Sequence, residues 1–400
     1  DDNPTDGTWW YADVDGDTYG DPNVSMAACS QPAGYVADNT DCNDLNLNIY
    51  PGAPEYCDGD DNDCNGVVDD NPVDGTTYYA DIDSDGYGDA NNTVSECSMP
   101  SGYVDNSYDC DDQDRSEPVV ADAVYGTTGA AGTMNDPLLS LQDAIDQAQE
   151  CVVANAGTYA ETIDLGGTSI DVWGVEGADN TFIDPNLSPC TTSNPSTCET
   201  AVAIASGTGA SPSLHGFTIQ GGSGYTTSST TTTSCADSVA SHHGNNTCSV
   251  TVYEYYGGGI YVNGDSPILS DLYVRGNTLP VFSQTHVGSF SQYWIYSYGG
   301  GIALLNTTAT LTDVTVFDNY ADEGGGIYAG NNTLADFDQG AVSENTAENG
   351  AGIALNTGSM NFTNAGIACN TAGTDGGGLF TSISGTAYFI NTAFYHNISD

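Results

Sequence analysis

Positive charge is almost absent from this sequence. It contains no lysine and only two arginines, Arg115 and Arg275, against 55 acidic residues, so its formal net charge is −53. Such a surface repels nucleic acids and anionic membranes and offers no clamp for phosphate, but it attracts cations. Residues 1–117 hold 29 of the 55 acids. This concentration favours local cation binding over a general halophilic surface, which stays an alternative for the rest of the chain.

Long apolar runs are also missing. No stretch approaches the ~20 apolar residues of a membrane-spanning helix, so we expect no membrane span in this chain. The sequence shows no signal peptide, and it begins and stops within repeats. We therefore interpret it as a mature fragment or as one stretch of a longer protein.

A repeat of about 26 residues dominates the C-terminal part. Gly-Gly-Gly-Ile or a close variant begins at Gly257, Gly299, Gly324, Gly350 and Gly376. A second ladder keeps the same register, with Gln220 in its first position and then Asn277, Asn319, Asn345, Asn370 and Asn397. Short β-prone runs without helical periodicity predict about three strands and three turns per unit. The pattern predicts a mainly β fold, a parallel β-helix in which stacked coils pair strand on strand.

Residues 1–117 contain an internal duplication at an offset of 68 residues. Tyr11-Ala12-Asp13 matches Tyr79-Ala80-Asp81, and the second copy breaks off after about Asp114. We expect an acidic repeat at 1–68, a truncated second repeat at 69–117, a linker with a capping helix at 118–150 and the β-helix at 151–400.

Three acidic loops within these repeats place carboxylates or carboxamides at alternate positions. Alternate residues of a tight turn converge, and a hard cation takes 6–8 oxygens, including a backbone carbonyl at the seventh loop position. We predict Ca²⁺ as the cofactor, with these ligands: Asp13, Asp15, Asp17, Tyr19 and Asp21; Asp61, Asp63, Asn65, Val67 and Asp69; Asp81, Asp83, Asp85, Tyr87 and Asp89. The flanking helices and the final Glu of an EF-hand are missing. Solvated Asp-Gly turns are the alternative, whereas zinc is disfavoured because the region contains no histidine.

Twelve cysteines, many at matched spacings, indicate disulfides and an oxidising compartment, so we expect an extracellular or cell-surface protein. Pairing each cysteine with a near neighbour predicts Cys29–Cys42, Cys57–Cys64, Cys97–Cys110, Cys190–Cys198 and Cys235–Cys248. Cys151 and Cys369 have no obvious partner. Because the repeats contain little apolar core, metal and disulfides are expected to stabilise them.

The acidic repeats resemble a known family. Asp-x-Asp-x-Asp-Gly-Tyr-Gly-Asp is followed by Cys-x-x-Pro-x-Gly-Tyr-Val, Asp-Cys-x-Asp, Pro-Gly-Ala-x-Glu-x-Cys-Asp-Gly and Asp-Asn-Asp-Cys-x-Gly. This series is similar to the metal-binding repeats known as MopRM, over residues 10–70 and, in part, 78–114. The resemblance implies metal binding outside the cell, in a large secreted or surface protein.

The chain after residue 117 resembles a second group of proteins. Leu138, Leu139, Leu141, Ala144, Ile145 and Ala148 give one apolar helical face. A short helix followed by an apolar strand is similar to the start of pectin-lyase-like right-handed β-helices, where the helix caps the core. The glycine triplets and the Val/Phe-x-x-Asn pattern resemble polymorphic outer-membrane passenger domains.

Two insertions, at 223–256 and 280–298, interrupt the coils between the ladder residue and the next glycine triplet. We therefore expect them to leave from the same corner of neighbouring coils. They contribute a candidate ligand or partner surface: Tyr253, Tyr255, Tyr256, Phe290, Tyr293, Trp294, Tyr296 and Tyr298. Such aromatics stack on sugars or fill a partner's pocket, or they pack on one another to fix the loops.

These features predict a non-catalytic, calcium-stiffened adhesive or filament subunit that associates with itself, head to tail or side by side, or with a cell-surface glycan. We therefore expect it not to be an enzyme. The alternatives are a polysaccharide lyase or hydrolase and a carbohydrate-binding β-helix. A lyase would depend on Arg275, the only basic residue of the coils. A hydrolase would need two facing carboxylates, and the coils show no such acidic cluster. Eight Asn-x-Ser/Thr sequons leave glycosylation open.

Overall fold

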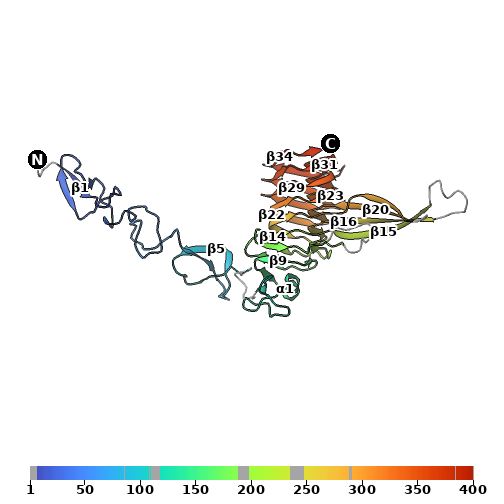
Figure 1. The fold of residues 1–400 in the computed structure, drawn as a ribbon, viewed down its shortest axis with the longest axis horizontal. Helices are drawn as coiled ribbons and strands as arrows, with labels where there is room; N and C mark the ends of the chain where they lie inside the picture. The colour runs from blue at the N-terminus through green and yellow to red at the C-terminus, as the bar shows by residue number, and fades with distance from the viewer. Residues whose placement is uncertain are drawn as a thin grey trace. The chain divides into compact units, whose positions relative to one another are not determined.

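The computed structural model describes residues 7–84, 86–107, 109, 118–187, 198–234, 247–287, 291–382 and 384–399. The chain divides into two compact units, residues 1–117 and residues 118–400. Both are built from strands, with a single α-helix among the described residues (Figure 1). None of the described helical residues forms a segment long and apolar enough to cross a lipid bilayer.

The N-terminal unit contains two small antiparallel sheets. In the first, β1 (Thr8–Ala12) lies between β2 (Ser25–Ala28) and β3 (Tyr35–Val36). In the second, β4 (Thr76–Ala80) lies between β5 (Asp89–Glu96) and β6 (Tyr103–Val104), so β1 and β4 are 68 residues apart, as the duplication predicts. The buried apolar residues in the described part of this unit are few: Ala12, Ile49, Ala53 and Ala80.

Among the described residues of this unit there are two disulfides, and neither joins near neighbours within one loop. Cys42 bonds to Cys64 with a Cα–Cα distance of 5.7 Å, and Cys57 bonds to Cys97 with 5.4 Å. The predicted pairs Cys29–Cys42, Cys57–Cys64 and Cys97–Cys110 are therefore wrong, and Cys29 is a free, exposed thiol. Cys42 meets Cys64 because the third acidic loop folds back onto the segment that follows β3. Cys57–Cys97 links the first copy to the second.

The other cysteine predictions are only partly covered by the described residues. Cys198 and Cys151 are both disulfide-bonded, whereas Cys369 is a free, exposed thiol. Cys190, Cys110 and Cys235 lie outside the described residues, so the pairs Cys190–Cys198 and Cys235–Cys248 stay predictions.

Residues 118–400 form a right-handed parallel β-helix with three sheets. Sheet I contains, in spatial order, β10 (Ile163–Asp164), β13 (Val202–Ile204), β17 (Ile260–Asn263), β21 (Ile302–Leu305), β24 (Ile327–Gly330), β28 (Ile353–Asn356) and β32 (Leu379–Thr381). Sheet II runs through β33 (Thr386–Ile390), β29 (Ser359–Thr363), β25 (Leu334–Asp338), β22 (Thr308–Phe317), β18 (Ile268–Arg275), β14 (Ser213–Ile219), β11 (Asp171–Gly174), β8 (Cys151–Ala154) and β7 (Val119–Ala121), and it also includes β9 (Gly157–Tyr159), β12 (Thr181–Ile183), β26 (Ala341–Ser343), β30 (Gly366–Ala368) and β34 (Ala393–Tyr395).

Sheet III completes the later coils. Its order is β15 (Tyr225–Ser234), β16 (Thr247–Tyr256), β20 (Ser291–Tyr298), β23 (Tyr320–Glu323), β27 (Thr346–Asn349), β31 (Thr371–Asp375) and β35 (Ile398–Ser399), with β19 (Ser283–Val287) beside β20. Figure 1 shows the coils stacked one above another. Apolar side chains of successive coils fill the interior as one continuous core, in which Phe217, Phe337 and Phe362 are among the largest fully buried side chains.

The glycine triplets turn the chain into sheet I. The first glycine of each triplet has a positive φ, for example +65° at Gly324, which glycine adopts without steric cost. The third must be small for another reason: a Cβ on Gly326 would lie 2.6 Å from the carbonyl oxygen of Gly352 in the next coil. The following residues stack in register along sheet I, as in Ile302↔Ile327↔Ile353.

The asparagine ladder forms as the sequence predicts. The backbone N and Nδ2 of Asn319 both donate to Oδ1 of Asn345 (3.1 and 3.0 Å), and those of Asn345 donate to Oδ1 of Asn370 (both 3.0 Å). Gln220 does not join the ladder, because the backbone N of Gly222 takes its place opposite Asn277 (3.0 Å). The ladder thus locks the corner between sheets II and III.

The predicted capping helix is α1 (Leu141–Gln147). Leu141, Ala144 and Ile145 are buried in the same core as the coils, whereas Leu139 is exposed and does not belong to the apolar face. Ser140 caps the N-terminus, and Glu161 accepts from both the Ser140 hydroxyl (2.6 Å) and the Leu141 N (2.7 Å). The helix therefore contributes its apolar face to the core at the first coils.

Both insertions are β-hairpins that lie side by side. β15 and β16 pair antiparallel, as do β19 and β20, and β16 pairs parallel with β20 from Ser249↔Ser291 to Tyr256↔Tyr298. Figure 1 shows this arm extending from the side of the coils. The prediction that both insertions leave from one corner is confirmed.

Candidate functional site

The first acidic loop gathers three of its predicted ligands. Oxygen atoms of Asp13, Asp15 and Asp17 lie within 4.8 Å of one another. The loop holds this shape because Asp13 accepts from the Gly16 N (2.7 Å) and each remaining carboxylate accepts from a backbone N two residues further on.

Two carboxylates from a later segment join this loop. Asp15, Asp41 and Asp44 form a second group of oxygens within 4.8 Å, and the Val14 N donates to Asp44 (2.7 Å). We call these five residues, Asp13, Asp15, Asp17, Asp41 and Asp44, the acidic cage. Sequence reasoning missed Asp41 and Asp44 as ligands, although Asp-Cys-x-Asp was part of the recognised pattern.

The electrostatics of the acidic cage disfavour five bare charges. Burial raises the pKa of Asp17, Asp41 and Asp44, and the neighbouring carboxylates raise each pKa further; a backbone hydrogen bond to each of the three opposes the rise. No lysine exists to neutralise them. A bound cation would remove this repulsion.

The donor atoms of the acidic cage fit a hard divalent cation. Asp15, Asp17 and Asp41 each use one carboxylate oxygen to accept a backbone N–H, and the second oxygen, Oδ2, is buried without a hydrogen-bond partner. Asp41 is only 3% exposed. Buried polar atoms are rarely left unpaired, and an ion coordinated by these three oxygens would satisfy them.

One predicted carboxylate of this loop, that of Asp21, bonds to a neighbouring residue. Oδ1 of Asp21 accepts from the backbone N and the side-chain Nδ2 of Asn23 (2.8 and 2.9 Å). Tyr19 was predicted to contribute its backbone carbonyl, which stays a prediction; its ring stacks on Tyr50, with centroids 5.7 Å apart. The described clusters of acidic oxygens do not include Asp21.

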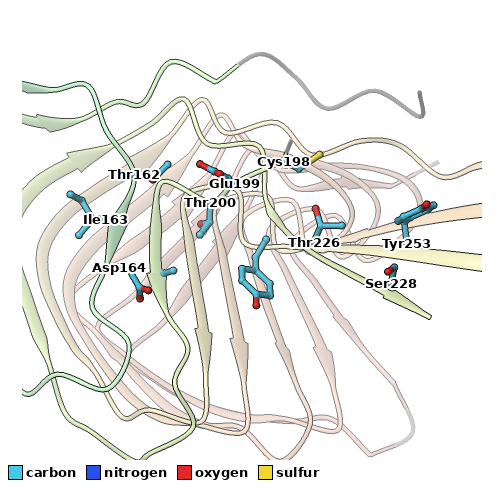
Figure 2. A pocket seen from close by; sticks show the side chains of 11 residues that line it. Thr162, Ile163, Asp164, Cys198, Glu199, Thr200, Thr226, Ser228 and Tyr253 are labelled. Atoms are coloured by element: carbon cyan, nitrogen blue, oxygen red, sulfur yellow. The ribbon is translucent and has the colours of Figure 1, made fainter. Parts of the chain in front are cut away.

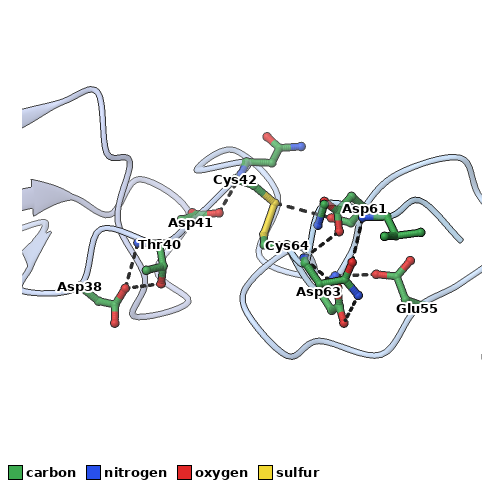
Figure 3. The surroundings of a disulfide bond; sticks show 12 residues. Asp38, Thr40, Asp41, Cys42, Glu55, Asp61, Asp63 and Cys64 are labelled. Carbon is green, nitrogen blue, oxygen red and sulfur yellow. Dashed lines mark hydrogen bonds between the residues drawn. A yellow bond between two sulfur atoms is a disulfide. The ribbon is translucent and has the colours of Figure 1, made fainter. Parts of the chain in front are cut away.

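The third acidic loop is arranged differently. Oxygens of Glu55, Asp61 and Asp63 cluster, but Glu55, only 5% exposed, accepts from the backbone N of Asp63 (2.6 Å) and of Asp69 (3.1 Å). Figure 3 shows this loop beside the Cys42–Cys64 disulfide. Glu55 was not predicted, and its contacts show it clamping the loop.

The other predicted side-chain ligands of the third loop have backbone or amide partners, whereas the predicted Val67 carbonyl stays a prediction. Asp61 accepts from the N of Asn65 and of Gly66 (3.1 and 3.0 Å). Asn65 donates to Asp63 and accepts from the Val67 N (2.8 Å), and Asp69 accepts from the Gly59 N (2.9 Å). The two cysteines near Asp41 are joined as a disulfide and are not metal ligands. This loop therefore has fewer oxygens to offer than the acidic cage.

The second loop repeats the backbone of the first. The Asp81 N donates to the Gly102 carbonyl (2.9 Å), as the Asp13 N donates to the Gly34 carbonyl (3.0 Å). Asp83 is the counterpart of Asp15, and Asp89 lies at the start of β5. Asp85, the counterpart of Asp17, lies outside the described residues, and Tyr87 is the counterpart of Tyr19.

The predicted aromatic surface is divided between two sides of the arm. Tyr255 is fully buried, in a cluster with Leu279, Ile295 and, at its edge, Tyr253. Tyr256 stacks on Tyr298 on the opposite side, with centroids 5.1 Å apart. Of the remaining positions, Trp294 and Tyr296 contact each other (6.4 Å), whereas Phe290 and the side chain of Tyr293 lie outside the description. Most of the described aromatic residues of this set therefore pack against other side chains.

A cavity of about 770 Å³ lies where β15 leaves the coils. Thr162, Asp164, Glu199, Ser228 and Tyr253 line it (Figure 2), together with Tyr225. Tyr225 is 40% exposed, and its ring stacks on Tyr261 with centroids 4.4 Å apart. An aromatic ring beside carboxylates and hydroxyls is suited to a ligand that carries both a flat apolar face and hydroxyl groups.

The fold and the acidic cage define a protein with acidic metal-binding repeats and a β-helix. Residues 41–70 match the family model Cu-binding_MopE, described as "Putative metal-binding motif". The match contains Asp41, Asp44 and the third loop, and it confirms the resemblance of this region to metal-binding repeats. No curated protein matches the chain.

Comparison with solved structures finds carbohydrate-active enzymes. A pectin methylesterase in complex with a hexasaccharide is 12% identical and has a TM-score of 0.33, with 66% of this chain and 81% of that chain covered. Pectin methylesterase PemA from Erwinia chrysanthemi is 11% identical (TM-score 0.31, 70% and 91% covered). A GH136 lacto-N-biosidase from Eubacterium ramulus is 10% identical (TM-score 0.31, 65% and 43% covered). These matches, all enzymes by name, contradict the prediction that the chain is not an enzyme, and that prediction is not kept.

Proposed function

We propose that this chain is an extracellular calcium-binding protein whose β-helix binds carbohydrate. The observation that carries the calcium part is the set of buried, unpartnered Oδ2 atoms on Asp15, Asp17 and Asp41. The disulfides favour an oxidising compartment, which supports a location outside the cell.

The donor chemistry favours Ca²⁺ over copper, despite the name of the matching family model. Copper prefers imidazole nitrogen and sulfur ligands, whereas carboxylates and carbonyls suit Ca²⁺. Residues 1–117 contain no histidine, and four of their cysteines are oxidised. The flexible, all-oxygen character of the acidic cage also favours Ca²⁺ over Mg²⁺, which demands near-octahedral geometry.

Calorimetric titration of the full chain with Ca²⁺, Mg²⁺ and Cu²⁺ tests this assignment. Asp41→Asn should weaken Ca²⁺ binding by at least tenfold, because it removes one charge and one coordinating oxygen from the acidic cage. Asp38→Asn is the matched control, since Asp38 accepts from the Thr40 N (2.9 Å) and belongs to none of the acidic clusters. Equal Ca²⁺ affinity in both variants, or tighter binding of Cu²⁺ than of Ca²⁺, would overturn the proposal.

The carbohydrate part rests on the cavity beside β15. Exposed tyrosine rings stack on the apolar faces of sugars, and Asp164 and Glu199 can accept hydrogen bonds from sugar hydroxyls. Neutral oligosaccharides should bind the wild-type chain and lose at least tenfold in affinity with Tyr225→Ala. Tyr125→Ala, at a site 81% exposed and outside the cavity, should leave affinity unchanged. Self-association of the chain and binding to a cell-surface partner stay predictions.

A further inference from the structure

Arg275 is the only basic residue of the coils, and its environment is unusual for a chain with 55 acidic residues. Among the described residues it forms no ion pair: its Nε donates to Gln220 (3.1 Å). Gln220 in turn donates to Asp184 (2.8 Å), so the nearest carboxylate of this network is reached only through an amide. A structural arginine in so acidic a protein would be expected to pair directly with a carboxylate.

The guanidinium lies at a cavity of about 380 Å³ on the outer side of sheet II. Phe182, Thr218, Tyr273 and Thr315 form one row across β12, β14, β18 and β22, and Arg275 stands opposite Phe317 in the next row. These rows face outward because the residues between them, such as Val274, are fully buried in the core.

The cavity combines three kinds of contact. Phe182, Tyr273 and Phe317 give it apolar walls, and the guanidinium carbon of Arg275 lies 5.8 Å from the centre of the Phe317 ring. The turn after β11 contributes Asp179 and is held in place because Thr218 donates to the Ala178 carbonyl (2.6 Å). A ring-sized group is suited to this volume, which is at the low end of about 300–1,000 Å³ for ligand sites.

We propose that this cavity binds a ring-bearing carboxylate, whose two oxygens accept from the guanidinium of Arg275 while the ring contacts the aromatic walls. Gln220 holds Nε and so leaves the Nη groups to form a two-point contact, the geometry in which arginine recognises carboxylates. Two sources carry this chemistry: an acidic sugar residue of a glycan and an aromatic carboxylic acid. Asp179 favours the sugar, because a carboxylate in the cavity can accept hydrogen bonds from ring hydroxyls.

The test uses the full chain in calcium buffer and four probes: a galacturonate trisaccharide, its methyl ester, phenylacetate and a neutral galactose oligosaccharide. Calorimetry should show binding of the acidic trisaccharide and at least tenfold weaker binding of its ester. Arg275→Gln should reduce that affinity at least tenfold. Arg275→Lys should reduce it by less, since lysine keeps the positive charge but cannot donate two parallel hydrogen bonds to a carboxylate. Arg115→Gln removes the same charge from the N-terminal unit and should leave the affinity for the trisaccharide unchanged.

The outcomes separate the possibilities. Phenylacetate binding that needs Arg275, without binding of the trisaccharide, would support the carboxylate site with the aromatic acid as its source. Equal affinity for acid and ester, no binding of either acid, or equal effects of Arg275→Gln and Arg115→Gln would overturn the proposal. Melting curves report whether each variant is folded. The acidic cage lies in the other unit, so failure of calcium binding would leave this result unaffected.

Discussion

Asp265 shows how much a single residue can contribute to the β-helix. It is fully buried, and its carboxylate accepts backbone N–H groups at 2.9–3.2 Å from five residues of earlier coils: Gly167, Ser206, Thr208, Gly209 and Ala210. Burial by itself raises the pKa of Asp265, but these hydrogen bonds, with those of the Ser206 hydroxyl, outweigh burial, and the net pKa is lowered. One carboxylate therefore fixes the turns of separate coils.

Asp265→Asn should lower the free energy of unfolding of the β-helix by about 2 kcal/mol or more at pH 7, because an amide cannot replace a carboxylate that accepts so many N–H groups. Because the pKa of Asp265 is lower in the folded state, its carboxylate stabilises the fold at every pH above the ordinary aspartate pKa of 3.8. This stabilisation is lost as the pH falls through the folded-state pKa. The difference in unfolding free energy between wild type and variant should therefore become smaller in acid. Denaturant unfolding at pH 7, 4 and 3 measures this difference, and a difference that grows in acid would contradict a lowered pKa of Asp265.

The acidic cage was only partly predictable at the level of residues. Asp13, Asp15 and Asp17 follow from their spacing, since alternate residues of a tight loop converge. Asp41 and Asp44 could not be derived in that way, because they reach the loop only when β1 and β3 pair. The cysteine pairs failed for a related reason: equal spacing within each copy suggested local loops, whereas Cys57–Cys97 joins the two copies.

Thiol labelling checks the corrected disulfide pattern. Under non-reducing conditions, maleimide should modify Cys29, because its side chain is a free, exposed thiol. Cys42, Cys57, Cys64 and Cys97 should react only after reduction and unfolding. Peptide mass mapping reads out each site; protection of Cys29, together with recovery of a disulfide-linked Cys29–Cys42 peptide, would show that the sequence-based pairing was correct after all.

At the level of elements, the asparagine ladder sets the register of the coils. Asn345 is fully buried; its Nδ2 donates to the Val316 carbonyl (2.9 Å) and its Oδ1 accepts twice from Asn319. Because every rung bonds to the next, removing one leaves buried groups of its neighbours without partners.

Asn345→Ala should therefore cost about 3 kcal/mol or more in unfolding free energy. Asn361→Ala is the matched control in β29, since the Asn361 side chain is exposed and its one side-chain partner among the described residues is Asp336 (2.7 Å); this variant should stay within about 0.5 kcal/mol of wild type. Chemical denaturation followed by circular dichroism compares the two, and similar losses would argue against a special role of the ladder.

The sequence predicted the regular coils better than the arm. Glycine triplets and asparagines recur at one period, so their register is visible without coordinates. The Ser/Thr-rich run of β15 carries no alternation of apolar and polar residues, and it is a strand because it pairs with β16, which in turn pairs with β20. Its structure depends on contacts between insertions, which a local pattern does not encode.

For the whole molecule, the two units should unfold separately. The N-terminal unit buries few apolar residues and, under the proposed function, relies on Ca²⁺, whereas the β-helix has a continuous core. Chelation with EGTA should lower the melting temperature of the first transition and leave the second unchanged. Differential scanning calorimetry with and without Ca²⁺ measures this; a single transition that shifts as a whole would contradict it.

The corner between the ladder residue and the glycine triplet has a practical consequence. Two coils already accept hairpins there without losing the alignment of the residues on either side. Since β16 and β20 also pair with each other, a hairpin grafted between Asn345 and Gly350 would leave the coils beside the existing arm, two strands of sheet III beyond β20. The solenoid can thus serve as a display scaffold, in which new loops are added one level at a time along a single vertical seam.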